Sequence, residues 1–542
     1  MKFCEEQKPE VIGVILVIAV TVLRIKAGAE AFGSMFAFQG GRNKLRHWLT
    51  LLSGLVESLF FTGLAFGWAS LVFVLKIDGY FAGHCANTTR EEDYAVHIDC
   101  QDEHFPLVMS VASIANTIIR FPIGYVFDSC GTTVTRLIAI FLYTTGTLFI
   151  SLSNTATSVL LYPAMSCLIT SGTILHLTNV QVGNLFDNYR STVINIYNGA
   201  YDSSAAVFLI IKLLHERGVS LHSSFFFLTS CSVIHFLRTF FLMPRGHIPY
   251  PLPETFTYGI GCPGQSRGKG EGENKMKEVD VKKDQKQKRA DNETPASHLL
   301  QKTLQEPKQE QATFQSCVMS WLFLWHLVWV VTILFCQVIF LSTVNPMLTR
   351  LANNDQTLVS HYTNAFAFTQ LCGVLVAPIN GLIMDRYKRK PLAPGETKRE
   401  ADLRSSSLAL FLTSLQCFLF CVCFTCPVLP LQYLTFVLQV VNSAFFYGGH
   451  QAFVSIAFPM SHFGKMSGVA MSLSALVLLL QLPIHHFIQH LLHGDPLYVN
   501  VGVTLVSLLA FIHPLHVSFY CRKLAKQRKT EREVNEQQSA KC

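Results

Sequence analysis

Apolar runs long enough to cross a lipid bilayer recur along the whole chain, and this repetition restricts the fold more than any other feature. A membrane-spanning helix needs about 20 mostly apolar residues. Six such runs precede a long polar segment and six follow it: about 48–75, 105–127, 136–154, 157–183, 190–214, 223–243, then 320–344, 359–384, 406–426, 431–458, 466–492 and 498–520. The sequence therefore predicts an all-α membrane protein with about twelve transmembrane helices in two six-helix halves.

The composition agrees with a membrane protein. Hydrophobic residues make up 50% of the 542 residues and charged residues only 14%, whereas soluble domains are about 25% charged. The net charge of +8 is concentrated in a few segments between apolar runs. Such a distribution is typical of membrane orientation and requires no nucleic-acid partner. The composition argues against an ordinary soluble enzyme.

The polar segments divide the chain into five parts. We expect an N-terminal extension (1–45), a six-helix half (46–243), a largely disordered cytoplasmic loop (244–316), a second half (317–520) and a basic tail (521–542). The extension contains a short apolar stretch, 11–23, which is either an uninformative segment or the core of a signal peptide.

Basic residues gather on one side of the predicted membrane topology. They lie before the first span, in the central loop, in the loop around Lys388 and in the tail after Tyr520. Because Lys and Arg are enriched in cytoplasmic loops, we expect both termini in the cytoplasm of a plasma-membrane protein.

The opposite side carries few bases and holds a glycosylation sequon at Asn87. Cys85 and Cys100 flank this polar loop, so they are either a disulfide on an oxidising outer face or two free thiols. Most other cysteines lie inside apolar runs. The densest group, which starts at Cys417 and ends at Cys426, indicates helix packing, and we predict no metal site.

An internal repeat supports two related halves. The pattern Gly-x-x-x-Asp ends the second span of each half, as Gly124 with Asp128 and as Gly381 with Asp385, with the two aspartates 257 positions apart. Glycine permits close helix approach, and an aspartate one turn later can cap a neighbouring helix N-terminus or pair with a base. The second copy is followed by Arg386, whereas the first has Ser129, so a charge lock in the N-terminal half either depends on Arg136 or is weaker. We assign these residues to gating: Gly124, Asp128, Arg136, Gly381, Asp385 and Arg386.

Polar residues inside the spans are candidates for the substrate site, because ionisable groups in a bilayer usually mark a cavity or an ion pair. Asn195, Asn198 and Asp202 share one helix face. Aromatic rings beside amides suit a flat neutral heterocycle, with packing between helices as the alternative. Arg120 could bind an anionic group, extend toward the cytoplasm or meet Glu57. The predicted lining residues are Glu57, Asn116, Asn198, Tyr201, Asp202, Trp329, Asn364, Gln370 and Tyr447.

Motifs of enzymes are absent from the sequence. No nucleophile elbow, phosphate-binding loop or His-Glu-x-x-His motif occurs. His485, His486, His490 and His493 form a local cluster, which we interpret as a solvated helix end rather than a metal site. We predict no catalytic residues and no cofactor.

Several longer stretches resemble solute carrier family 43 of the major facilitator superfamily, and within it the branch that carries nucleobases. The matching stretches are Gly67–Phe73, Asn198–Ser204, Leu242–Pro253, Tyr362–Gln370, Leu429–Gln439 and His462–Lys465. The resemblance implies sodium-independent, facilitative movement of purine nucleobases such as adenine, guanine and hypoxanthine by alternating access. Arg120 departs from the neutral residue expected in that branch.

Three other classes stay open from the sequence. The family's second branch carries large neutral amino acids, for which Asp202 would meet the ammonium and Arg120 the carboxylate. A membrane enzyme that holds a transition metal at the group from His485 to His493 is the second, and a sensor or scaffold that uses the basic central loop is the third. The expected partners are a small-molecule substrate and the lipid bilayer, with no nucleic acid and a monomeric state.

Overall fold

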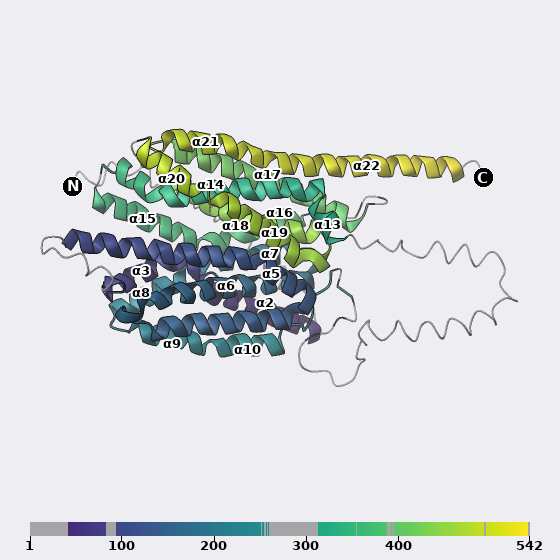
Figure 1. Cartoon of the computed structure of the whole chain (residues 1–542). Helices are drawn as coiled ribbons and strands as arrows, with labels where there is room; N and C mark the ends of the chain where they lie inside the picture. Colours follow the sequence, from purple (N-terminus) through teal and green to yellow (C-terminus); the bar gives the residue numbers. More distant parts are fainter. Residues whose placement is uncertain are drawn as a thin grey trace, which may run out of the picture.

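The computed structural model of the chain describes residues 42–82, 94–250, 313–353, 355–386, 396–492 and 495–539, with isolated positions between 252 and 258 and at 392 and 394. Within these residues all regular secondary structure is helical. The helices form two bundles that lie side by side, the first purple to teal and the second green to yellow (Figure 1). The predicted all-α fold in two halves is confirmed.

The N-terminal half opens with one interrupted span. α2 (Arg42–Glu57) continues through a π-helical turn, η1 (Ser58–Thr62), and a 3₁₀ turn, η2 (Leu64–Gly67), into α3 (Trp68–Ile77). The remaining elements are α5 (Tyr94–Leu152), η3 (Thr155–Leu160), α6 (Leu161–Val180), η4 (Gln181–Leu185), η5 (Asp187–Tyr189), α7 (Arg190–Ser203), α8 (Ala206–Glu216), α9 (Leu221–Ser230) and α10 (Ser232–Phe241).

α5 consists of two antiparallel arms. Gly131 breaks the helix with φ 79° and ψ −173°, a conformation that residues with a Cβ rarely adopt. Beyond the break the chain runs back, because Phe81 stacks on His104 of the first arm and its amide bonds Ser158, just after the second arm. The two predicted spans 105–127 and 136–154 are these two arms.

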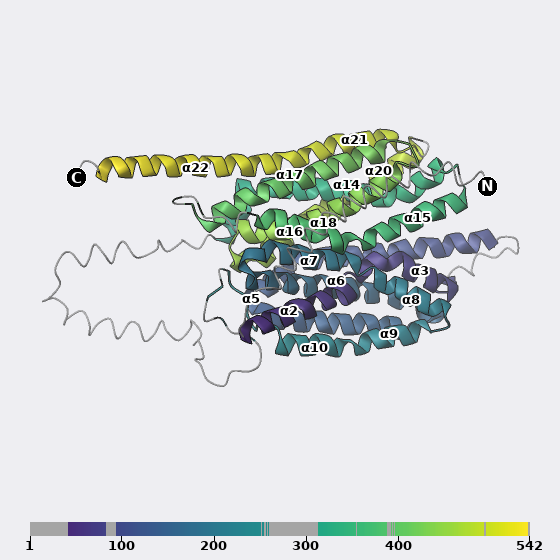
Figure 2. The ribbon, with the colours of Figure 1, turned by 180° about the vertical axis from the view of Figure 1, so that it is seen from behind.

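The C-terminal half repeats the pattern. Its elements are α13 (Phe314–Val318), α14 (Trp321–Leu351), α15 (Gln356–Leu371), α16 (Gly373–Asp385), α17 (Lys398–Thr425), α18 (Gln432–Ala457), η6 (Met460–His462), α19 (Phe463–Leu478), α20 (Gln481–His490), α21 (Leu497–Ser507), η7 (Leu508–Phe511) and α22 (Ile512–Ser539). α22 projects beyond the bundle at the C-terminal end of the described chain (Figures 1 and 2).

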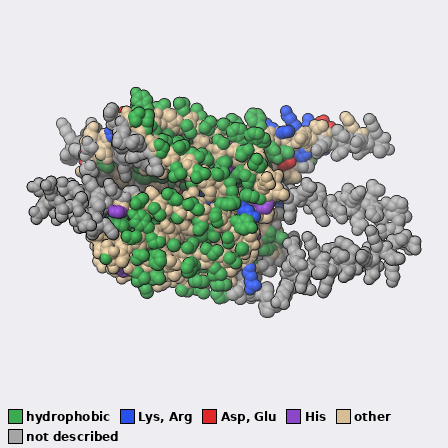
Figure 3. Space-filling model, in the orientation of Figure 1, with side chains coloured by type: hydrophobic (Ala, Val, Ile, Leu, Met, Phe, Trp, Pro, Cys, Tyr) green, Lys and Arg blue, Asp and Glu red, His purple; other side chains and the backbone are tan. Residues whose placement is uncertain are grey.

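Each of the twelve predicted runs falls on a helix or on consecutive helices. By length and composition alone, six helices of the described chain are suited to crossing a membrane, or seven if the bent pair α15 and α16 is one span. Several other runs are interrupted near their middle, as at Gly63 and between α7 and α8, so their pieces are short. Apolar side chains cover the flank of both bundles, with Lys and Arg side chains near one end (Figure 3).

We call the end of the bundle that carries Gly131, Met243 and Arg386 the tail end, and the opposite end the far end. At the tail end α5 crosses α19 and α7 crosses α16; the second pair lies side by side in Figure 2. A Cβ at Gly124 would overlap the backbone of Gly464, and one at Gly381 would overlap the backbone of Thr192. The glycines of the repeat therefore allow the two halves to touch backbone to backbone.

Candidate functional site

A cavity of about 60 Å³ lies between the two halves, near the crossing of α5 and α19. Its walls come from α5, α6 and α7 of the N-terminal half and from α18 and α19 of the C-terminal half. The lining residues are Arg120, Ile123, Thr173, His176, Leu177, Asn198, Tyr201, Tyr447, His450, Gln451, Gly464, Ser467, Gly468 and Met471. A ligand held here contacts both halves at once.

Hydrogen bonds fix the polar wall of the cavity. Asn198 Nδ2 donates to the Ile194 carbonyl oxygen at 2.8 Å, which turns Asn198 Oδ1 toward His176 Nε2 at 3.1 Å. The carbonyl can only accept, so the amide orientation follows and His176 Nε2 is the donor. The Tyr201 ring lies 4.5 Å from the His176 ring, centroid to centroid. The wall therefore combines an aromatic face with one ordered amide and one ordered imidazole.

Five buried polar atoms in and next to this wall have no hydrogen-bond partner: Asn116 Oδ1, Arg120 Nε, His176 Nδ1, Asp202 Oδ1 and Gln451 Oε1. Buried polar atoms are nearly always paired with protein or water, and each exception needs an explanation. Arg120 and His176 line the cavity. Asn116 lies one turn before Arg120 on α5, and Asp202 follows Tyr201 on α7. A concentration of unpaired groups at the interface of the halves is what a binding site awaiting a polar ligand requires.

The structure brings Asn198, Tyr201 and Tyr447 of the predicted lining set to the cavity wall. Asn364 is exposed on α15, and Gln370 Nε2 donates to Gln439 Oε1 at 2.6 Å. Glu57 and Trp329 lie away from the cavity, each fully buried within its own half.

Glu57 lies at the centre of an ion cluster in the N-terminal half. Its carboxylate meets Arg136 Nη2 at 2.5 Å, Arg238 Nη1 at 2.5 Å and His235 Nδ1 at 2.7 Å, and it accepts from Asn179 Nδ2 at 2.9 Å. These residues are at most 3% exposed. Arg136, which we expected to act near Asp128, is thus part of the interior of the half.

Three histidines form a chain in the C-terminal half. His513 Nε2 lies 3.1 Å from His326 Nδ1, and His326 Nε2 lies 2.9 Å from His450 Nδ1. His450 Nε2 continues to Ser467 Oγ at 3.2 Å. His450 and Ser467 line the cavity, so the chain runs from its wall into the half. His326 also stacks on Trp329, whose Nε1 donates to Ser414 Oγ.

Sequence reasoning identified Glu57 but missed Arg238, His235 and all three members of the histidine chain. Their common signal is an ionisable side chain inside a predicted span. The cluster joins the first, third, fourth and sixth spans of the N-terminal half, and the histidine chain joins the first, fourth and sixth spans of the C-terminal half. The sequence drew attention instead to the histidines that begin at His485, because they lie close together along the chain.

The two aspartates of the repeat cap helices of the opposite half. Asp128 accepts from the backbone N–H groups of Gly464 and Lys465 at 2.9 and 2.8 Å, at the start of α19. Asp385 accepts from the N–H groups of Ser191 and Thr192 at 3.1 and 2.7 Å, at the start of α7. Carboxylates satisfy the free N–H groups and the positive dipole of a helix N-terminus. The capping that the repeat suggests is present twice, in reciprocal form.

Further contacts join the halves beside these caps. Arg190 Nη2 donates to the Ser455 carbonyl oxygen at 3.0 Å, and Asn380 Nδ2 donates to Asn195 Oδ1 at 2.9 Å. Arg386 Nη1 donates to the carbonyl oxygen of Ile383 within its own half. The halves are therefore fastened to each other on the tail side of the cavity.

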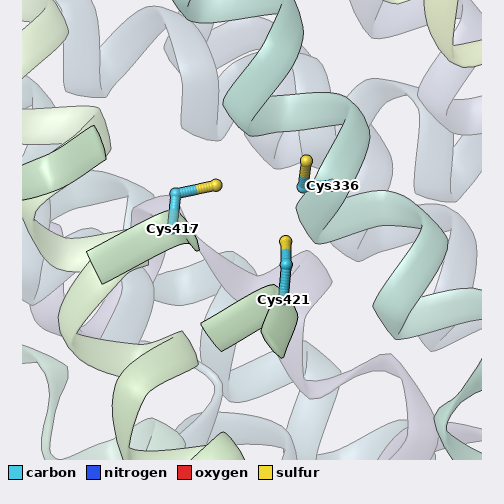
Figure 4. A group of neighbouring side chains, drawn as sticks. All are labelled: Cys336, Cys417 and Cys421. Carbon is cyan, nitrogen blue, oxygen red and sulfur yellow. The ribbon is translucent and has the colours of Figure 1, made fainter. Parts of the chain in front are cut away.

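A thiol group lies in the interior of the C-terminal half. Cys336, Cys417 and Cys421 place their Sγ atoms within 4.8 Å of one another (Figure 4). All are buried, and the surrounding cluster consists of apolar and aromatic side chains such as Phe340 and Phe420. A metal thiolate there would be a buried anion, and the cluster around it provides no cation to balance it. We interpret these cysteines, as the sequence indicated, as small apolar packing residues.

Some expectations fall outside the described residues. They concern the sequon at Asn87, a pairing of Cys85 with Cys100, and the side chains of the local histidine group at 485–493.

Comparison with known proteins gives a consistent result. The family model of the Major Facilitator Superfamily matches residues 58–480. The bovine (Bos taurus) "Equilibrative nucleobase transporter 1" is 46% identical over 484 residues, which cover 88% of this chain and 96% of that protein. The human "Large neutral amino acids transporter small subunit 3" is 26% identical over 535 residues, covering 89% and 95%. The solved structure of the proton:xylose symporter XylE bound to 6-bromo-6-deoxy-D-glucose aligns with a TM-score of 0.51 at 11% identity, covering 89% and 96%.

Proposed function

The chain belongs to the Major Facilitator Superfamily and, within it, to solute carrier family 43, and on that premise we propose that it carries purine nucleobases, such as adenine, guanine and hypoxanthine, down their gradient without sodium. The bovine relative, a nucleobase transporter by name, supports the substrate class. The observation that carries the proposal on the structural side is the cavity between the halves, with its aromatic wall and unpaired polar atoms.

The cavity suits a flat heterocycle. The rings of Tyr201 and Tyr447 offer faces for stacking, and Asn198 holds His176 so that one ring nitrogen points away from the amide. Asn116 and Asp202 add unpaired acceptor atoms next to the wall. We assign substrate contact to these groups. Glu57 and Trp329 instead stabilise the interiors of the halves, and we assign no substrate contact to Asn364 and Gln370 on α15.

Transport follows from rocking the two halves about the cavity. In the described arrangement the halves are fastened at the tail end by the two reciprocal caps and the glycine contacts. Releasing these contacts opens the cavity toward the tail end, and approach of the halves at the far end closes it there. A neutral substrate crosses in this way without a coupled ion.

The basic loops and tail support a plasma-membrane carrier whose tail end faces the cytoplasm, with both termini inside. The cavity lies entirely within one chain, which supports a monomer as the working unit. Its partners are then the substrate and the bilayer.

Uptake of labelled adenine, hypoxanthine and leucine, with and without sodium, in cells that lack their own carriers tests the proposal. We expect purine uptake that is independent of sodium and absent for leucine. Tyr201→Ala, which removes one stacking ring, should reduce purine uptake at equal surface expression. The matched control is Tyr498→Ala, because Tyr498 is 73% exposed near the far end. Leucine uptake without purine uptake would refute the proposal.

One observation favours a second candidate, a carrier of large neutral amino acids. Arg120 has a buried Nε without a partner, as the binding of a carboxylate requires, and the human relative is named as an amino-acid transporter. If the chain carries amino acids, Arg120→Gln should abolish leucine uptake. Neither the wild type nor the variant should then take up purines.

A further inference from the structure

We propose that Arg120 and His176 form a subsite that selects oxopurines over aminopurines, so that hypoxanthine and anionic oxopurines such as urate are carried in preference to adenine. The inference rests on the proposed function for the purine scaffold. The inference specifies that the cavity recognises the edge of the purine at C6 and N1.

Arg120 differs from the other deeply placed arginines. Arg136 and Arg238 bond the carboxylate of Glu57, and Arg190 donates to Asn184 Oδ1 at 2.7 Å and lies over the Tyr250 ring. Among the described residues no acid lies within ion-pair distance of Arg120, and its Nε has no hydrogen-bond partner. A buried guanidinium N–H left unpaired inside a membrane protein is costly. A ligand with an acceptor oxygen would satisfy it.

His176 supplies the complementary group. Its Nε2 donates to Asn198 Oδ1 at 3.1 Å, and its Nδ1 has no partner. In the neutral ring with the proton on Nε2, Nδ1 is an acceptor. Arg120 and His176 line the same cavity and lie within electrostatic range of each other. The wall thus presents the N–H groups of Arg120 next to an imidazole acceptor.

The two classes of purine carry opposite hydrogen-bond patterns on this edge. Hypoxanthine and urate present a carbonyl oxygen at C6 beside an N–H at position 1, an acceptor next to a donor. Adenine presents an amino group beside a bare ring nitrogen, a donor next to an acceptor. A guanidinium N–H is a good donor to a purine carbonyl oxygen at C6, so Arg120 would pair with that oxygen while His176 Nδ1 accepts from the N–H at position 1. The amino group of adenine would instead face the N–H groups of Arg120.

The position of Arg120 links this recognition to movement. Its backbone carbonyl lies so close to Gly468 of α19 that a Cβ there would come within 2.8 Å of it. The guanidinium therefore sits on α5 where α5 crosses the other half. An oxo group bound to Arg120, with the ring against Tyr447 of α18, would bridge the halves.

Competition in one cell line gives the test. Cells without purine carriers express the wild type, Arg120→Gln or Arg120→Lys, and uptake of labelled hypoxanthine, urate and adenine is measured side by side. In the wild type we expect kcat/KM for hypoxanthine to exceed that for adenine by about 10-fold or more. Arg120→Gln should lower hypoxanthine and urate uptake by about 10- to 100-fold and leave adenine uptake unchanged or higher.

The ratio of the two uptakes in the same cells does not depend on how much protein folds. Arg120→Lys keeps the charge but loses the planar fork, so its ratio should lie between the other two. The matched control is Arg217→Gln, because Arg217 is exposed at the far end; its ratio should equal that of the wild type.

The outcomes separate the two proposals. Purine uptake with the same ratio in the wild type and in both Arg120 variants would overturn the subsite and leave the proposed function intact. An equal loss of hypoxanthine and adenine uptake would also overturn it, since Arg120 would then act on the fold. If the wild type carries no purine at all, both proposals fail.

Discussion

In the N-terminal half a carboxylate, Glu57, lies between two guanidinium groups and an imidazole, whereas the C-terminal half places three imidazoles on the corresponding spans. Both groups are fully buried, and both tie together the first, fourth and sixth spans of their half, to which the ion cluster adds the third span through Arg136. The repeated architecture therefore fixes where polar contacts hold a half together, but not which chemistry provides them.

The difference predicts different tolerances. The ion cluster depends on charge balance, because one acid faces two arginines that have no other carboxylate within reach in the described structure. The histidine chain depends only on an alternation of donors and acceptors, which neutral side chains other than histidine can reproduce. We expect a single substitution in the ion cluster to destabilise the N-terminal half. We expect the histidine chain to accept conservative replacements.

The largest effect should come from Glu57→Gln. The change preserves shape but leaves Arg136 and Arg238 buried without a counter-charge, at a cost of about 3–5 kcal/mol. We expect a large fall in the thermal unfolding midpoint of the purified protein and little surface expression. The matched control is Glu216→Gln, since Glu216 is exposed and pairs only with Lys212 at 3.9 Å. Normal stability with an altered choice of purine would place Glu57 in the substrate site instead.

An intermediate effect should follow from His326→Leu. The leucine would leave His450 Nδ1 and His513 Nε2 without partners, and each unsatisfied buried group costs about 1–3 kcal/mol. His326→Gln, whose amide can donate and accept, should recover most of the lost thermal stability. If His326→Leu and His326→Gln were equally stable, the hydrogen bonds of the three histidines would not stabilise the C-terminal half. The contrast drawn between the two halves would then be wrong.

A smaller effect is expected from the caps. Asp385→Asn and Asp128→Asn each remove a charged cap worth about 0.5–2 kcal/mol, and this weakens the closed tail end. Asp385 is 2% exposed and also accepts from the Thr192 hydroxyl at 2.8 Å, so its variant should lose more maximal uptake than the Asp128 variant. The order in which purines compete should stay the same; a changed order would mean that the caps touch the substrate.

The smallest effect concerns pH at the far end. Asp495 accepts from Arg350 Nη2 at 2.9 Å, and this hydrogen bond holds the pKa of the carboxyl below its ordinary value. Stability from a lowered pKa is present above the unfolded value of about 4 and is lost as the pH falls through the folded value. Both side chains are exposed, so the pair contributes below about 1 kcal/mol. From pH 8 to pH 5 the thermal unfolding midpoint of Arg350→Gln should therefore lie slightly below that of the wild type, and the two midpoints should converge as the pH falls below about 4; a difference of the same size at pH 3 would contradict the assignment.

The sequence predicts the spans well because an apolar run of about 20 residues has few alternatives in a membrane. It also indicates a cap as one of two roles for the aspartate of the repeated Gly-x-x-x-Asp, the other being an ion pair with a base. It does not predict the breaks within spans, as at Gly63, because local propensity there is overridden by close contact with Tyr201 of another helix.

The groups that join distant helices were harder to predict. Spacing along one helix shows that Asn195 and Asn198 share a face, but not that Asn195 meets Asn380 while Asn198 meets His176. His326, His450 and His513 are far apart in the chain, and only the packing of the helices brings them into line. A search for one ionisable residue per span at equivalent places in the two halves would have found most of them.

The reciprocal caps have an evolutionary consequence. Asp128 of the first half completes a helix of the second, and Asp385 of the second completes a helix of the first, so neither half is self-sufficient at the tail end. This is the bonding pattern of a twofold-symmetric dimer in which each of two identical subunits makes the same exchange. Duplication and fusion of such a subunit would preserve both bonds, while the interiors of the copies, which never meet, would be free to diverge into carboxylate and imidazole versions.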